Sequence, residues 1–270
     1  MKQTVMELNW EGGGYHGFPG AMGPGGYTSA EEVVAWKGFE QVLASAKNGD
    51  FSGAERLLDI YDDAGWLLSG ACAELLGDIG SRALFERIRP VVTAILDPMY
   101  SVDLGCSLAI GGHLSSVPAL LETLGKIAEF EDAPALIQML SVMLEPEPGP
   151  LGDIDRLDDI DTYADDVRLQ ADALAARLGT TDAVVMFGDL FSIDKLVAAT
   201  RRSLTNNGLF NTYLRHKLEA TTGFDFSGFY ENGSLRPLRA LAVIEDFEDT
   251  GKLARYQPGR RYFFGHPVPD

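Results

Sequence analysis

The sequence is poor in residues that would cross-link the chain or carry it into a membrane. Its 270 residues include two cysteines, Cys72 and Cys106, and no run of about 18 apolar residues, the length that spans a bilayer. Residues 1–10 lack the apolar core of a secretory signal. We therefore expect a cytoplasmic protein that does not enter a membrane, with both cysteines reduced and buried.

Positive charge is also scarce, and it is unevenly distributed. The chain has 22 Lys and Arg residues against 40 Asp and Glu residues, a net charge of −18. Residues 1–194 carry 11 basic and 32 acidic residues, a balance of −21, whereas residues 195–270 carry 11 and 8, a balance of +3. The negative electrostatic field of such a chain argues against a nucleic-acid partner and would attract a basic protein. The alternative is that the acidity serves only solubility.

Motifs for cofactor, metal or catalytic chemistry are incomplete. The GxGxxG string at residues 12–17 has the spacing of a dinucleotide fingerprint, but Pro19 follows it and cannot open the required helix. A calcium loop starting at Asp153 would place Asp158 and Ala164 where glycine and glutamate are needed. The histidines lack zinc-site spacing, and no serine or cysteine stands in a nucleophile motif. We predict a non-enzymatic protein without cofactor or metal.

Glycine and proline divide the chain into regions. Residues 11–27 hold eight glycines and two prolines, so residues 1–27 are predicted to be irregular. Residues 28–196 show the apolar periodicity of a helical stack, interrupted by three prolines and seven aspartates in a predicted acidic loop at residues 145–166. Residues 197–270 are predicted to be a helical and aromatic region packed on the stack. Its residues 232–234 predict a turn, and residues 257–259 predict the turn of a short β-hairpin.

The apolar periodicity also predicts individual helices within these regions. Two predicted pairs are residues 66–76 with 81–96, joined by a turn at residues 77–80, and residues 102–110 with 117–128, joined at Gly111 and Gly112. Further predicted helices cover residues 132–144, 167–178, 183–196, 205–222 and about 235–248.

One phrase of the sequence occurs twice. Residues 68–80 (LSGACAELLGDIG) are echoed 34 residues later by residues 102–114 (VDLGCSLAIGGHL), and an apolar helical stretch follows each copy. A repeat of this period is typical of stacked helical hairpins. The turns at residues 75–84 and 110–121, and more weakly residues 178–184, resemble those of bacterial HEAT-like repeats. The resemblance implies a mostly α-helical solenoid and no particular activity.

The whole chain has a second resemblance. An acidic, mostly helical protein that ends in residues 259–269 (GRRYFFGHPVP) resembles the immunity proteins of bacterial polymorphic-toxin systems. As a class, such proteins bind one toxin domain tightly and block it, which implies a basic protein as the partner. We predict that the contact is made by seven aspartates: Asp153, Asp155, Asp158, Asp159, Asp161, Asp165 and Asp166.

Other interpretations stay open at this point. The aspartate-rich segment could be a solvated linker. The whole chain could be a scaffold or assembly subunit that inhibits nothing. It could also be a small-molecule enzyme that uses the glycine-rich segment as a lid.

Overall fold

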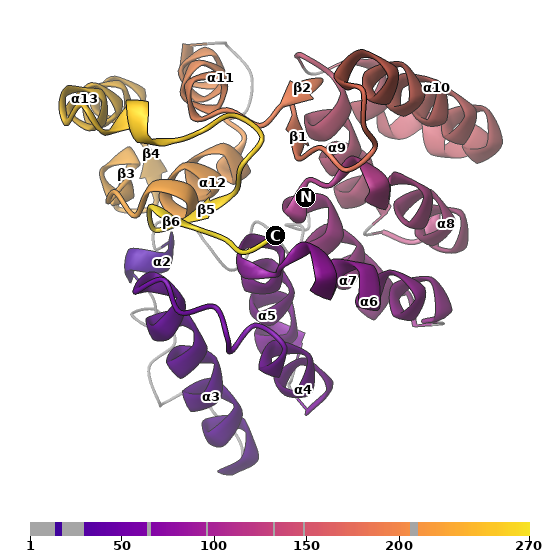
Figure 1. Ribbon diagram of the computed structural model, residues 1–270, viewed down its shortest axis with the longest axis horizontal. Helices are drawn as coiled ribbons and strands as arrows, with labels where there is room; N and C mark the ends of the chain where they lie inside the picture. Colours follow the sequence, from indigo (N-terminus) through magenta and orange to yellow (C-terminus); the bar gives the residue numbers. More distant parts are fainter. Residues whose placement is uncertain are drawn as a thin grey trace. The chain divides into compact units, whose positions relative to one another are not determined.

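The computed structural model describes residues 14–17, 30–63, 66–95, 97–131, 133–147, 149–205 and 210–270. The described chain is mostly helical with a few short strands, which confirms the predicted helical class (Figure 1). It divides into two compact units: a terminal unit, residues 1–70 with 192–268, and a central unit, residues 71–191 with 269–270. No described helix combines the length and apolar character needed to cross a bilayer.

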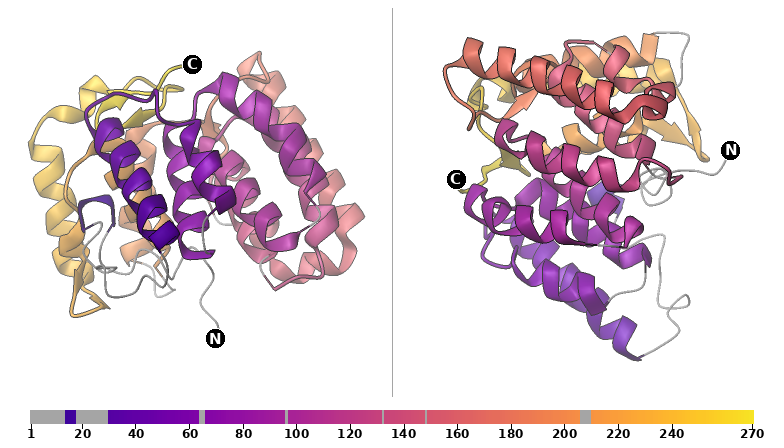
Figure 2. Two further views of the ribbon diagram at one scale, coloured as in Figure 1. Left: turned by 90° about the horizontal axis from the view of Figure 1, so that it is seen from below. Right: turned by 90° about the vertical axis from the view of Figure 1, so that its right-hand side faces the viewer.

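The central unit is a set of packed helices. They are α6 (Arg82–Ala94), α7 (Pro98–Gly111), α8 (Val117–Ile127), α9 (Ala133–Leu144) and α10 (Ile160–Leu178), with most of α5 (Trp66–Ile79). α7 packs on α6, α8 and α9, and α8 also packs on α6, α9 and α10 (Figures 1 and 2). Leucines with no exposed surface, such as Leu108, Leu120 and Leu136, fill the space between them. A HEAT-like stack over residues 28–196 stays a prediction.

The two copies of the repeated phrase pack against each other. A Cβ added to Gly77 of α5 would lie 2.7 Å from Ile110 Cβ and 2.9 Å from the Ser107 carbonyl oxygen of α7, so only glycine allows this approach. Both cysteines are buried and neither forms a disulfide, as predicted, and burial raises the pKa of the Cys72 thiol. The echo therefore marks two helices in close contact.

Several predicted boundaries in the central unit are wrong. α5 continues through Ile79, so the turn predicted at residues 77–80 is mostly helix. α7 begins at Pro98, four residues before the predicted start at residue 102, because Asp97 accepts a hydrogen bond from Met99 N (3.0 Å) and proline fits a first helical turn. A capping aspartate thus converts an apparent breaker into a helix start.

The helix predicted at residues 183–196 is also wrong. Strands β1 (Val185–Met186) and β2 (Asp189–Leu190) form an antiparallel hairpin, and α11 (Ile193–Thr205) begins only after it. The extended chain pairs with the turn after α7, where Leu114 N donates to Ala183 O (2.9 Å) and Val185 N donates to Gly112 O (2.8 Å). Periodicity alone cannot distinguish a short apolar strand from a buried helix.

The terminal unit contains helices from both ends of the chain. Its elements include α2 (Gly14–Gly17), α3 (Ala30–Lys47), α4 (Arg56–Asp63), α12 (Thr212–Thr222) and α13 (Pro237–Asp249), together with α11. α12 packs on α11, α2 and the strand β5, while α13 packs on α11. A cluster of aromatic rings supports this core, in which the ring centroid of Phe226 lies 5.7 Å from those of both Phe229 and Phe247.

Two β-hairpins complete the terminal unit. They pair β3 (Tyr230–Glu231) with β4 (Ser234–Leu235), and β5 (Tyr262–Phe263) with β6 (His266–Pro267). The predicted turn at residues 232–234 is confirmed, and so is a hairpin near the C-terminus. The turn of that hairpin lies at Phe264 and Gly265, however, while residues 257–260 form a separate turn.

Two further predictions for this unit need correction. The helix predicted at residues 205–222 is split: α11 ends at Thr205 and α12 begins at Thr212, capped by Asn211, whose side chain accepts from Tyr213 N (3.0 Å). Residues 14–17 of the segment predicted to be irregular form the one-turn helix α2. The rest of that segment, and residues 206–209, lie outside the described residues.

Candidate functional site

The segment predicted to be an acidic loop is largely helical. A 3-10 helix, η4 (Ile154–Asp159), leads directly into α10, so Asp161, Asp165 and Asp166 belong to α10. Asp159 caps that helix by accepting from Thr162 N (3.2 Å) and from Thr162 Oγ1 (2.8 Å). The prediction of a loop was wrong here because aspartate, which disfavours helix interiors, stabilises a helix start.

A buried glutamate fixes the beginning of this segment. Glu145 accepts hydrogen bonds from Ser141 Oγ (2.5 Å) and from Leu151 N (3.2 Å), which ties the proline-rich turn to the end of α9. Tyr163 of α10 donates to Leu151 O (3.1 Å). Burial, with a further contribution from Glu145, raises the pKa of Tyr163, and Arg156 opposes the shift. The segment is therefore held in one conformation by buried contacts.

The seven predicted aspartates fall into two groups. Four have partners close by in the chain: Asp153 and Asp159 act as helix caps, Asp165 pairs with Arg168 (2.8 Å), and Asp166 pairs with Arg156 (2.6 Å). The other three are exposed, and no side-chain partner is found for them in the described chain: Asp155, Asp158 and Asp161. Asp153, Asp159 and Asp166 serve mainly local structure. The other three are available to another molecule, and so is Asp165, whose side chain stays 79% exposed in its surface ion pair.

Two apolar side chains are exposed among these carboxylates. Ile154 of η4 is 51% exposed and Leu169 of α10 is 69% exposed. Asp161, Asp165 and Leu169 stand four residues apart and share one side of α10. We call Ile154, Asp155, Asp158, Asp161, Asp165 and Leu169 the acidic face.

A second polar cluster lies in the terminal unit, where sequence reasoning had found none. Residues 213–222 of α12 are all buried, although they include Arg215, His216, Lys217 and Glu219. Arg215 and Glu219 form an ion pair, Nη2 to Oε2 3.2 Å, with side-chain exposures of 3% and 0%. The signal in the sequence was a predicted helix with four ionisable residues among the five positions 215–219.

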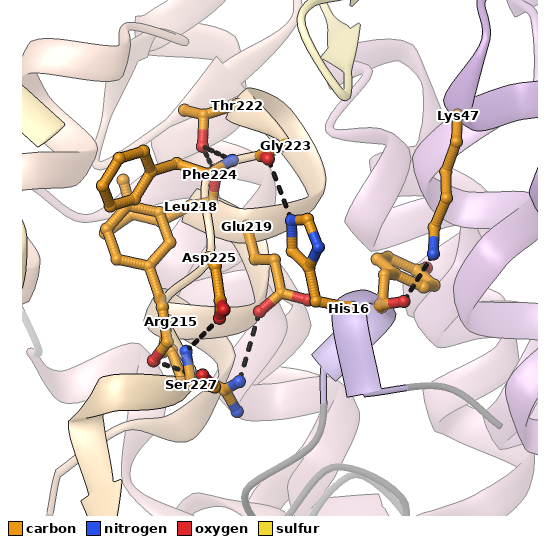
Figure 3. Close-up of polar contacts among 12 residues, drawn as sticks. His16, Lys47, Arg215, Leu218, Glu219, Thr222, Gly223, Phe224, Asp225 and Ser227 are labelled. Carbon is orange, nitrogen blue, oxygen red and sulfur yellow. Dashed lines mark hydrogen bonds and ion pairs between the residues drawn. The ribbon is translucent and has the colours of Figure 1, made fainter. Parts of the chain in front are cut away.

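Glu219 also anchors the N-terminal helix α2. Its carboxylate accepts a hydrogen bond from His16 N (2.7 Å), and Gly14, with φ of +52°, lies so close that a Cβ would collide with both carboxylate oxygens. His16 Nε2 donates to Gly223 O (2.9 Å), and Lys47 Nζ donates to Tyr15 O (2.6 Å). Figure 3 shows Glu219 between His16 and Arg215.

Aromatic rings close this cluster. Tyr15 is fully buried, with its ring centroid 4.7 Å from that of His216 and 5.2 Å from that of Phe263. Lys47 lies over the ring of Phe264 (5.1 Å), and burial lowers its pKa while Glu219 partly offsets the shift. Because Glu219 has no exposed surface and accepts from both sides, the arrangement is suited to holding α2 in place rather than to transferring protons.

The described structure can also be compared with the metal-site and dinucleotide motifs of the sequence. In the described residues, no group of three or more His, Cys, Asp or Glu side chains could hold a metal ion. The glycines at residues 12 and 13 of the GxGxxG string lie outside the described residues, whereas Gly14 packs on Glu219. No protein-family model, curated protein or solved structure matches the chain.

Proposed function

We propose that this chain is a non-catalytic protein-binding module whose acidic face receives a basic partner protein. The observation that carries the proposal is the combination, on η4 and α10, of unpaired carboxylates with exposed Ile154 and Leu169. Apolar side chains supply the buried contact of an interface, and the charges around them select and orient the partner. A face that only solubilised the protein would need no exposed leucine.

The charge of the central unit supports a basic partner. That unit holds 22 acidic residues against 7 basic ones, whereas the terminal unit holds 18 against 15. A field of one sign raises association rates for a partner of the opposite sign, most strongly at low salt. We propose that Asp155, Asp158 and Asp161 make the contact, with Asp165 beside them, while the remaining predicted aspartates hold the segment in shape.

The most specific form of the proposal is an immunity protein. In this form the partner is a toxin domain with a cationic substrate site, and the acidic face covers that site. The excess of acid in the central unit and the resemblance of the chain to immunity proteins both support it. No catalytic group of this chain is required, because inhibition by coverage needs only affinity and position.

The test is a comparison of charge variants against the natural partner. The partner is copurified from the native host and identified, and its association rate is measured over a range of salt concentrations. The triple variant Asp155→Asn, Asp158→Asn, Asp161→Asn should associate about tenfold more slowly at low salt, with a flatter salt dependence. Leu169→Ser should instead speed dissociation, because it removes apolar contact area.

A matched control separates the acidic face from net charge. Asp62→Asn, Asp246→Asn and Asp249→Asn together change the charge by the same amount at exposed positions of α4 and α13. The control variant should associate nearly as fast as the unmodified chain. Equal slowing in both triple variants, or an unchanged rate in the first, would remove the acidic face from the interaction.

A further inference from the structure

The three β-hairpins of this chain share one construction. Each hairpin spans eight residues: 184–191, 229–236 and 261–268. In each, the backbone N–H of the last residue donates to the carbonyl oxygen of the first. The three hydrogen bonds are Phe191 N to Val184 O (2.9 Å), Arg236 N to Phe229 O (2.8 Å) and Val268 N to Arg261 O (3.0 Å). The two residues at each tip both have positive φ, which is typical of type I′ turns. They are Phe187 with Gly188, Asn232 with Gly233, and Phe264 with Gly265.

Two of these tips cap the C-terminal end of a helix. Phe187 N and Gly188 N donate to the carbonyl oxygens of Val142 (2.7 Å) and Met143 (3.1 Å), near the end of α9. Phe264 N and Gly265 N donate to the same positions of α12, Ala220 (2.7 Å) and Thr221 (2.9 Å). The last carbonyl groups of a helix lack partners within it, so each tip supplies donors that the helix needs.

The phenylalanines show that this capping role is demanding. A left-handed conformation costs a bulky residue energy, and the surrounding structure must compensate for it. Among the described non-glycine residues, only the first tip residue of each hairpin has a positive φ. The strain is thus confined to the tips.

The third tip, on the β3–β4 hairpin, has no helix end to cap. Asn232 and Gly233 are exposed, and neither forms a hydrogen bond with another element of the described chain. A Cβ added to Gly233 would meet nothing within 4 Å, whereas one added to Gly188 would lie 2.8 Å from Leu144 O. The same pair of donors is therefore presented to solvent.

The residues around this tip match the properties of a helix C-terminus. Two arginines pair with Glu231: Arg236 Nε lies 3.1 Å from Oε2, and Arg239 Nη1 lies 3.8 Å from Oε1. Two positive charges against one negative charge leave a net positive charge beside the tip. Leu238, between these arginines in the first turn of α13, is 84% exposed, the highest value among the large apolar residues described. The C-terminal end of a helix carries a partial negative charge and attracts cations.

We propose that the β3–β4 tip, with Arg236, Leu238 and Arg239, is an interaction surface for the C-terminal turn of an α-helix in a partner protein. Asn232 N and Gly233 N donate to the third-last and second-last carbonyl groups of that helix. The arginines offset its terminal charge, and Leu238 packs on an apolar side chain of its last turn. This surface lies in the terminal unit, whereas the acidic face lies in the central unit.

The experiment is an NMR titration of the full chain, labelled with nitrogen-15, with a synthetic peptide. The probe is an alanine-rich helix that ends in the sequence of residues 141–144 (SVML), the end that the β1–β2 tip caps, with a C-terminal amide. The amide resonances of Asn232 and Gly233 should shift saturably. A control peptide of the same helix, ending in a glycine motif that satisfies its own carbonyl groups, should cause much smaller shifts.

Matched variants make the result specific. Leu238→Ser should weaken binding of the probe about tenfold, because it removes apolar contact area. Val34→Ser, at an exposed apolar position of α3, should leave the affinity unchanged. The proposal is overturned if about 1 mM of the probe leaves both tip resonances in place. It is equally overturned if the two peptides shift them alike, or if the shifts arise from concentrating the protein alone.

Discussion

Replacing Glu219 by glutamine tests whether the buried ion pair holds the terminal unit together. The carboxylate accepts hydrogen bonds from Arg215 and from the backbone of His16, and it has no exposed surface. Glutamine has nearly the same shape but offers one acceptor oxygen and one donor amide. One of the two N–H groups therefore loses its acceptor, and the guanidinium of Arg215 loses the negative charge of Glu219.

The expected loss in the free energy of unfolding is large for the replacement of one carboxylate oxygen by an amide nitrogen. Removing one partner of a buried ion pair typically costs about 3–5 kcal/mol, because the remaining charge stays buried without that partner. A domain of roughly 150–250 residues loses about 2–4 °C of Tm per kcal/mol, so Tm should fall by roughly 6–20 °C. Glu231→Gln is the control: Glu231 pairs with Arg236 at the surface, and this change should cost less than about 1 kcal/mol.

Two measurements follow the change. Urea unfolding monitored by circular dichroism reports the free energy of unfolding, and hydrogen exchange reports whether the amide of His16 loses its protection. If Glu219→Gln does not fold, the double variant Arg215→Met, Glu219→Leu replaces both charges by apolar groups and should recover most of the stability. A cost below about 1 kcal/mol, or a His16 amide that stays protected, would refute the role given to this pair.

Three further predictions concern close approaches and one helix cap. Gly77→Ala should destabilise the central unit by about 1–3 kcal/mol in urea unfolding, because the new Cβ would lie 2.7 Å from Ile110 Cβ. Gly125→Ala is the control and should stabilise α8 slightly, because the space around Gly125 is open. Equal effects of the two substitutions would contradict the α5–α7 contact. Gly188→Ala should lower the free energy of unfolding more than Gly233→Ala does, since both residues have positive φ but only Gly188 approaches a helix end. A calorimetric measurement that ranks the two variants the other way would argue against the capping contact. Hydrogen bonds from Thr162 lower the pKa of Asp159 below its ordinary 3.8, so the stabilisation they provide is present at neutral pH and is lost as the pH falls through the lowered pKa. Thr162→Ala should move the carboxyl midpoint, followed by carbon-13 NMR, back toward 3.8, and an unmoved midpoint would exclude this cause.

Helices were the most predictable feature, and their boundaries the least. Apolar spacing located α8 and α9 to within a residue or so, because burial of one helix face depends on residues three and four apart. The starts of α7 and α10 were missed, because Asp97 and Asp159 act as caps only when their own backbone is non-helical, and the sequence does not show this. A capping residue and a loop residue have the same identity, and neighbouring structure decides between them.

The hairpins show a different limit. Asn232 with Gly233 is a strong turn signal, and the sequence located that turn correctly. Phe187 with Gly188 gave no such signal, since phenylalanine rarely adopts positive φ, and the conformation depends on the end of α9 more than 40 residues earlier. Contacts distant in sequence overrode the local preference of the residue.

The candidate sites divide along the same line. The sequence by itself determined the helical class, the excess of acid over base, the echo at Gly77 and Gly111, and the seven aspartates, because composition and spacing are properties of the chain alone. Only the tertiary structure decided which aspartates cap helices and which stay free. It alone joined His16 to Glu219 across 203 residues, because a buried charge takes its partner from whatever the fold brings within hydrogen-bond distance.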